Sequence, residues 1–262
     1  MTHINNELAN KRLKVASLLL TIFTSLMVFT YIFLLFRRFL LIADAIFEGY
    51  GSGGFLNRGE LLTNKDLLAT FTKIFDSLQV IALCGILIAF ILILISSHNQ
   101  YRKYLIVLVV NFSIMIILRL IRVILIHQGP ENFILIGNAY PDVETYYEFA
   151  FFIYSTDIMR LVITILLIIS VILFNIYLQK INDFKKNLGY TVPIILGIFL
   201  VFYVIIVILG AVLFTKINNK IDIVLYFLNY TVLSLIQIGN IIVYLSLGKM
   251  GRSILLKESK GV

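Results

Sequence analysis

Six long apolar stretches dominate this chain of 262 residues. They cover residues 15–36, 77–96, 104–126, 159–178, 192–214 and 224–247. A helix rises about 1.5 Å per residue, so about 20 apolar residues cross a hydrocarbon core about 30 Å thick. Backbone amide and carbonyl groups inside hydrocarbon must be paired within their own segment, which favours helices. The sequence therefore predicts an all-α fold, a polytopic integral membrane helix bundle with six transmembrane helices.

The composition excludes an ordinary soluble domain. Hydrophobic residues make up 60% of the chain, charged residues make up 14%, and the mean hydropathy is +1.00. We expect a single transmembrane domain over residues 1–262, whose first stretch is retained as a span because it lacks the short apolar core of a signal peptide. The net charge of +8 does not indicate nucleic-acid binding, because most Lys and Arg residues flank the spans. They indicate contact with the lipid bilayer and its anionic headgroups.

The distribution of Lys and Arg between alternating segments predicts the orientation. The two ends of the chain and the second and fourth connections hold 12 of these residues, and the other three connections hold 7. Basic residues favour the cytoplasmic side, so both termini are expected there, in what is expected to be the plasma membrane. The connection of residues 37–76 opposes this bias with five basic residues, whereas residues 127–158 support it with none.

Some helices are expected to extend beyond the bilayer. Residues 37–76 are predicted to be an extramembrane helical loop: the first helix continues to the glycine cluster at 49–54, and a new helix begins near Thr63. Thr63 and Asp66 fit a capping box. The fourth helix is expected to start near Pro141 and to run through Leu178. Residues 248–262 form a basic tail, either a short amphipathic segment along the inner leaflet or a disordered end.

Polar residues inside the spans are the candidate functional residues. A charged side chain at the centre of a span costs about 2.5–3.5 kcal/mol on insertion scales. Asn111, Arg119 and Arg122 share one face of the third span, since offsets of 8 and 11 residues return to nearly the same direction. Asp157 and Arg160 lie three residues apart on the fourth helix. These residues are predicted to form an intramembrane polar cluster or to line a solute pathway.

The sixth span repeats the polar spacing of the third. Asn229, Gln237 and Asn240 have the same offsets of 8 and 11 residues. Two such copies separated by three spans would run through the membrane in opposite directions, as in the inverted repeats of many transporters. Chance similarity in a chain of such low complexity is the alternative interpretation.

Two interpretations of the buried arginines follow. In the first, they pair with Asp157, Glu148 or Asp76 and hold helices together. In the second, they attract an anionic or polar solute into a cavity, with the acidic residues as counter-charges.

Catalytic and cofactor motifs are missing from the sequence. It contains no HExxH, paired-aspartate or GxSxG pattern, and its single cysteine, Cys84, excludes a multi-cysteine metal site. No enzyme activity, cofactor or metal is therefore expected. The sequence predicts a permease- or channel-type subunit that moves a small polar or anionic solute, as a homo-oligomer or with other membrane or energising subunits. The alternative is a non-catalytic structural or assembly subunit of a larger membrane complex.

Overall fold

The computed structural model describes residues 2–49, 65–97, 101–128, 143–182, 188–213 and 219–258, with side chains over narrower stretches of each. Within these residues the backbone forms six helices and no strand. The helices are α1 (Thr2–Gly49), α2 (Lys65–Ser96), α3 (Arg102–Gln128), α4 (Val143–Asn182), α5 (Leu188–Leu213) and α6 (Asn219–Glu258). The predicted all-α class is confirmed.

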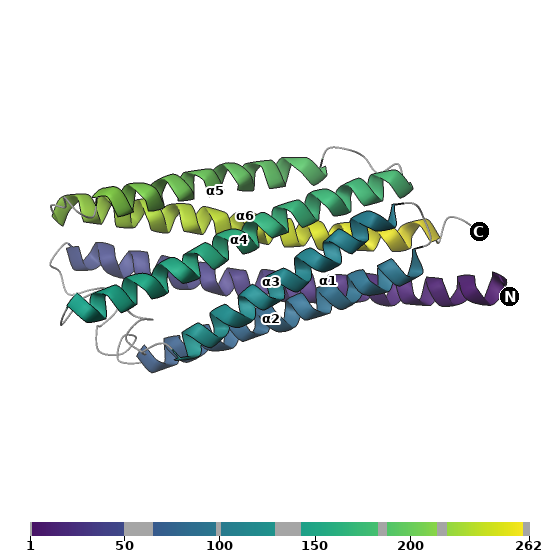
Figure 1. The fold of residues 1–262 in the computed structure, drawn as a ribbon, viewed down its shortest axis with the longest axis horizontal. Coiled ribbons are helices and arrows are strands. Elements are labelled where there is room, and N and C mark those ends of the chain that lie inside the picture. The colour runs from purple at the N-terminus through teal and green to yellow at the C-terminus, as the bar shows by residue number, and fades with distance from the viewer. Residues whose placement is uncertain are drawn as a thin grey trace.

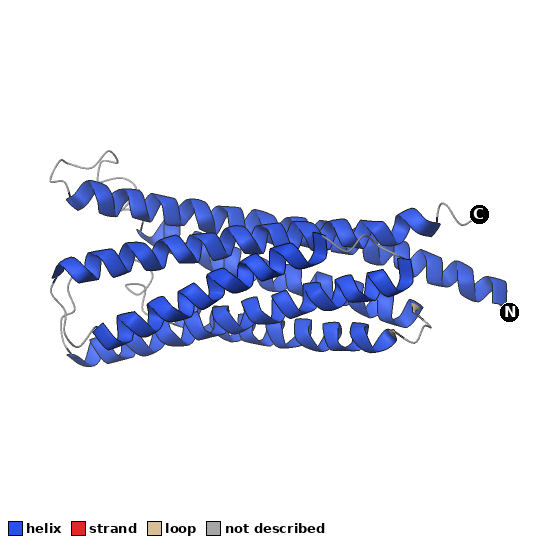
Figure 2. Cartoon of the chain, turned by 90° about the horizontal axis from the view of Figure 1, so that it is seen from above, coloured by secondary structure: helices blue, strands red, loops and turns tan. Residues whose placement is uncertain are grey.

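The helices run along one common long axis and pack side by side (Figure 1). α1 contacts α2 and α6, α3 contacts α2 and α4, and α5 contacts α4 and α6. Consecutive helices are therefore neighbours, and the contact between α1 and α6 closes the ring. The start of α1 and the end of α6 lie at the same end of the bundle, as the views in Figures 1 and 2 agree.

Five described stretches are long and apolar enough to cross a membrane. They are Glu7–Phe36, Thr70–Ser96, Arg102–Leu125, Ile158–Ile181 and Thr231–Arg252. The described apolar stretch of α5, Pro193–Ile205, is shorter, although the helix itself has 26 residues. At about 1.5 Å per residue α5 reaches about 39 Å, so six spans remain consistent with the backbone.

Four helices are much longer than a bilayer is thick: α1, α2 and α4, as predicted, and also α6, which has 40 residues. α1 has 48 residues, α2 has 32 and α4 has 40, which correspond to about 72, 48 and 60 Å. The described part of α1 ends at Gly49, where the glycine cluster begins. Thr63 of the predicted capping box lies outside the described residues.

The carboxy-terminal tail does not form a separate segment over its described part. α6 continues without a break from the sixth span to Glu258, so residues 248–258 are helical, whereas their position along the inner leaflet stays a prediction. Tertiary packing provides the physical reason. A Cβ atom on Gly248 would lie 2.5 Å from Thr24 Oγ1, and one on Gly251 would lie 2.9 Å from Leu20 Cδ1. The two glycines thus let α6 approach α1 closely, and these contacts offset their low helix propensity.

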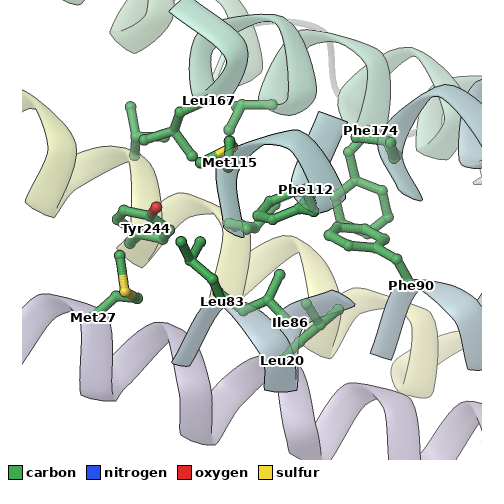
Figure 3. Packing of buried hydrophobic residues seen from close by; sticks show 14 of the residues in the cluster. Leu20, Met27, Leu83, Ile86, Phe90, Phe112, Met115, Leu167, Phe174 and Tyr244 are labelled. Atoms are coloured by element: carbon green, nitrogen blue, oxygen red, sulfur yellow. The ribbon is translucent and has the colours of Figure 1, made fainter. Parts of the chain in front are cut away.

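The interior of the bundle is filled by apolar side chains from all six helices. Phe90 of α2 lies between Phe112 of α3 and Phe174 of α4, with ring centroids 5.1 Å apart in both pairs (Figure 3). Other large apolar residues point outward, and Ile117 and Leu245 are each 55% exposed. Lipid chains are as apolar as the interior, so close packing rather than hydrophobic burial selects this arrangement.

The α1–α2 contact provides a stability prediction. A Cβ atom on Gly85 would collide with the ring of Phe23, whereas one on Gly197 of α5 would meet no atom within 4 Å. We expect Gly85→Val to destabilise the protein by about 1–3 kcal/mol through overpacking. The matched variant Gly197→Val carries the same change in helix propensity and should have little effect. Thermal unfolding of the detergent-solubilised chain measures both, and equal losses would contradict the packing described here.

Candidate functional site

Two arginines of α3 lie inside the bundle. Arg119 and Arg122 are 2% and 7% exposed, and their spacing of three residues places them on one helix face, as predicted. Taking a guanidinium out of water costs several kcal/mol unless charged and hydrogen-bonding partners compensate. The partners of these two side chains therefore define the site.

Asp76 of α2 is the carboxylate that both arginines approach. Its Oδ1 atom accepts a hydrogen bond from Arg122 Nη1 at 3.0 Å and lies 3.6 Å from Arg119 Nη1. Asp76 is 1% exposed. The sequence predicts Asp76 as one of three possible acidic partners of the arginines. The side chains of the other two, Asp157 and Glu148, lie outside the described residues.

Two tyrosines extend the site to α1 and α6. The hydroxyl of Tyr31 accepts a hydrogen bond from Arg119 Nη2 at 2.9 Å. The ring of Tyr31 stacks on that of Tyr244, with centroids 5.8 Å apart and planes 27° apart. Tyr244 is fully buried and interacts electrostatically with Tyr31 and Arg119. The arginine cluster, as we call it below, thus joins four helices and consists of Tyr31, Asp76, Arg119, Arg122 and Tyr244.

A buried polar stripe on α6 leads to the arginine cluster. Gln237, Asn240 and Tyr244 lie on one face of the helix, since spacings of three and seven residues return to the same direction. They are 6%, 3% and 0% exposed. The side chain of Asn229 lies outside the described residues, so the repeat between the third and sixth spans stays a prediction.

The other predicted residues approach from α4 or contact it. Asn111 Nδ2 donates a hydrogen bond to Ser170 Oγ of α4 at 3.4 Å, on the same face of α3 as the arginines but about two turns away. Arg160 of α4 is partly buried, and its charge acts on Arg122. The structure therefore brings Arg119, Arg122 and Arg160 toward one region and uses Asn111 as a separate link between helices.

Sequence reasoning missed several members of this interior. The tyrosines carried no signal, because the chain has 14 of them and tyrosine is common at membrane interfaces. Gln79 was also missed, although it follows Asp76 by three residues and so shares its helix face. Its Nε2 atom donates a hydrogen bond to Thr30 Oγ1 of α1 at 3.2 Å, and both residues are fully buried.

Several buried polar atoms in this interior have no hydrogen-bond partner within the described part of the chain. The donors are Nε and Nη1 of Arg119 and Nε of Arg122, the acceptors are Asp76 Oδ2, Gln79 Oε1, Gln237 Oε1 and Asn240 Oδ1, and the Tyr244 hydroxyl can act as either. Each unsatisfied buried group costs about 1–3 kcal/mol. A purely structural cluster would gain by pairing these groups, so their number favours a site that accepts a small polar molecule or ion.

The chemistry of the site suits an anion better than a metal ion. The described residues contain no group of three His, Cys, Asp or Glu side chains that could hold a metal. Two guanidinium groups face one carboxylate in the arginine cluster, and a cation would be repelled by the remaining positive charge.

Comparisons with models of known protein families, with curated proteins and with solved structures find no match to this chain. The function must therefore be inferred from the chemistry and geometry of the site.

The buried ion pairs predict a large effect of removing Asp76. The isosteric variant Asp76→Asn leaves two buried guanidinium groups without a carboxylate, and we expect it to lower the free energy of unfolding by about 3–5 kcal/mol. Glu7→Gln is the control, because Glu7 pairs with Lys11 at 3.0 Å but both side chains are 71% exposed. Such a pair contributes at most about 1 kcal/mol. Unfolding in detergent measures both variants, and equal stabilities would show that Asp76 is not held in the pairs described.

Proposed function

We propose that this chain is a permease- or channel-type membrane subunit that moves a small polar or anionic solute and catalyses no chemical reaction. One observation carries the proposal. The interior of the bundle combines an excess of positive charge in the arginine cluster with buried polar atoms that lack partners in the described chain. Pure membrane anchors need neither feature, and polar groups at membrane depth are retained mainly where they serve a pathway or a site.

The α6 stripe supports a pathway rather than an isolated ion pair. Gln237 and Asn240 precede Tyr244 by seven and four residues, so the stripe extends for about 10 Å along the helix. Each of the two amides has a side-chain oxygen without a partner in the described chain. A polar solute that carries hydrogen-bond donors can exchange one of these acceptors for the next along this face without full desolvation, whereas an anion would need the NH₂ groups of the same two amides.

The orientation and the energy source are parts of the same proposal. Placing both termini in the cytoplasm agrees with the excess of Lys and Arg on that side and with the common position of the two ends of the bundle (Figure 1). The plasma membrane is the proposed location. We further propose that the solute moves down its own gradient, or is coupled to an ion gradient or to an energising partner subunit, in a homo-oligomer or a larger complex.

A specific contact favours the second candidate, a structural or assembly subunit. Asp76, Arg122 and Arg119 link α2 to α3, and the bond from Arg119 to Tyr31 continues the link to α1. Such contacts can serve only to hold helices in register. The two candidates differ in whether water reaches the polar interior.

Thiol accessibility distinguishes these candidates. Cys84 is the only cysteine, so Cys84→Ser provides a background for single cysteines. If water enters the pathway, a water-soluble thiol reagent should modify cysteine at position 237 or 240 at least about tenfold faster than at two control positions. The controls are Val243, which is fully buried in the core, and Leu245, which points outward. Uniform protection at positions 111, 119, 237 and 240 would exclude the pathway and favour the assembly role.

A charge exchange tests whether Asp76 and Arg122 serve only as a pair. Asp76→Arg and Arg122→Asp should each destabilise the protein, and the double variant should recover most of the stability because the buried pair is restored with reversed direction. Solute flux should not recover, since the positive charge then lies on α2. Thermal unfolding and anion flux in proteoliposomes measure the two effects. Recovery of flux together with stability would show that pairing alone matters.

A further inference from the structure

Three donor groups of the arginine cluster make no hydrogen bond within the described chain. They belong to Arg119 and Tyr244, two residues that both contact Tyr31. Arg119 keeps Nε and Nη1 without a hydrogen-bond partner in the described chain, and Tyr244 keeps its hydroxyl. Tyr31 connects them, since it accepts a bond from Arg119 and stacks on Tyr244. Tyr244 also interacts electrostatically with Arg119. These donors therefore gather in the interior between α1, α3 and α6.

The carboxylate of Asp76 already occupies part of the anion-binding capacity of the two arginines. Planar guanidinium groups match carboxylates because two parallel N–H donors meet two oxygens. Asp76 uses this match incompletely: Oδ1 takes both arginine contacts, and Oδ2 is buried without a partner in the described chain. The distances are unequal, 3.0 Å to Arg122 and 3.6 Å to Arg119. Asp76 is therefore held mainly by Arg122. Its contact with Arg119 is the weaker one, so another anion can replace Asp76 at Arg119 more easily than at Arg122.

The charge of the arginine cluster selects the class of that anion. Two guanidinium groups and one carboxylate leave one positive charge among the five residues of the arginine cluster. Arg160, whose charge acts on Arg122, lies outside the cluster and is only partly buried, so its charge is screened more strongly. One monoanion would neutralise the charge of the cluster, whereas a dianion would leave an excess buried negative charge, which is costly in a low-dielectric interior. Burial of Arg119 and Tyr244 also limits the size of a ligand that the interior can hold.

From this geometry we infer that the arginine cluster binds one small carboxylate-like monoanion on Arg119 and Tyr244, in competition with Asp76. This inference rests on the proposed function and specifies its solute class. When the anion binds, its oxygens accept hydrogen bonds from Arg119 Nη1, which otherwise faces Asp76, and from the Tyr244 hydroxyl. Asp76 stays with Arg122, so no buried charge is left alone in either state.

Anion-dependent thermal stability of the full chain in detergent tests binding directly. Formate is the probe, sulfate is the dianion, and gluconate, a much larger monoanion, keeps the ionic strength constant. A ligand that binds only the folded state raises the melting temperature. We expect saturating formate to raise it by about 2–4 °C over gluconate, in line with the response of a chain of this size. Sulfate is excluded from protein surfaces and raises stability without binding, so its effect should be the same in the original chain and in Tyr244→Phe.

Two matched hydroxyl variants locate the binding. Tyr244→Phe removes one unpaired hydroxyl from a fully buried ring, so it should fold, and it should weaken formate binding about tenfold or more. Tyr177→Phe is the control, because its hydroxyl is bonded to Ser97 at 2.6 Å, outside the arginine cluster. It should leave the formate-dependent shift unchanged.

Removing the internal competitor should have the opposite effect. In Asp76→Asn both guanidinium groups lack their carboxylate, so formate should bind more tightly and raise the melting temperature by more than in the original chain. The same variant in gluconate reports the loss of stability by itself. A shift of equal or smaller size than in the original chain would contradict competition between Asp76 and the anion.

The outcomes separate this inference from the proposed pathway. Equal melting temperatures in formate and gluconate, a sulfate shift that is lost in Tyr244→Phe, or an unchanged formate response in Tyr244→Phe would each overturn the monoanion site. The pathway could then still be supported by thiol modification at positions 237 and 240. Conversely, formate binding with complete thiol protection would leave a buried anion site and remove the transport role.

Discussion

Hydrocarbon offers no hydrogen-bond partners, and the rest of this structure depends on that constraint. The described residues form six helices, because a helix pairs its backbone amide and carbonyl groups internally. The same constraint applies to side chains. Arg119 and Arg122 can remain buried because α2 supplies Asp76 and α1 supplies Tyr31. These bonds couple three helices, so the axial positions of α1, α2 and α3 are set together at the level of the arginines.

Close contact between helices depends on small residues rather than on a hydrophobic driving force. Gly248 and Gly251 bring α6 against Thr24 and Leu20 of α1, and Gly85 of α2 accommodates Phe23. The first of these contacts has a consequence for the site. Because α6 lies so close to α1, Tyr244 of α6 can stack on Tyr31 of α1. This contact places the polar stripe of α6 beside the arginine cluster. The α1–α6 contact thus connects helix packing with the geometry of the arginine cluster.

The polar interior is under-satisfied in a particular way. Its paired atoms lie between α1, α2 and α3, whereas α6 contributes mainly atoms without partners in the described chain. Atoms without partners in the described chain also occur on Asp76, Gln79 and both arginines, so the region between α2, α3 and α6 is where a solute can replace missing partners. The unequal distances from Asp76 to its two arginines extend this asymmetry into the arginine cluster itself.

The sequence by itself determined the helical class, the spans, the long first, second and fourth helices and the shared face of Asn111, Arg119 and Arg122. These features depend on local length, hydropathy and helical periodicity, which a single sequence carries. Only the tertiary structure decided that Asp76 pairs with the arginines, that Tyr31 and Tyr244 complete the cluster, and that α6 continues to Glu258. Such contacts depend on which helices are neighbours and on their axial offset, and these are set by packing between residues far apart in the chain.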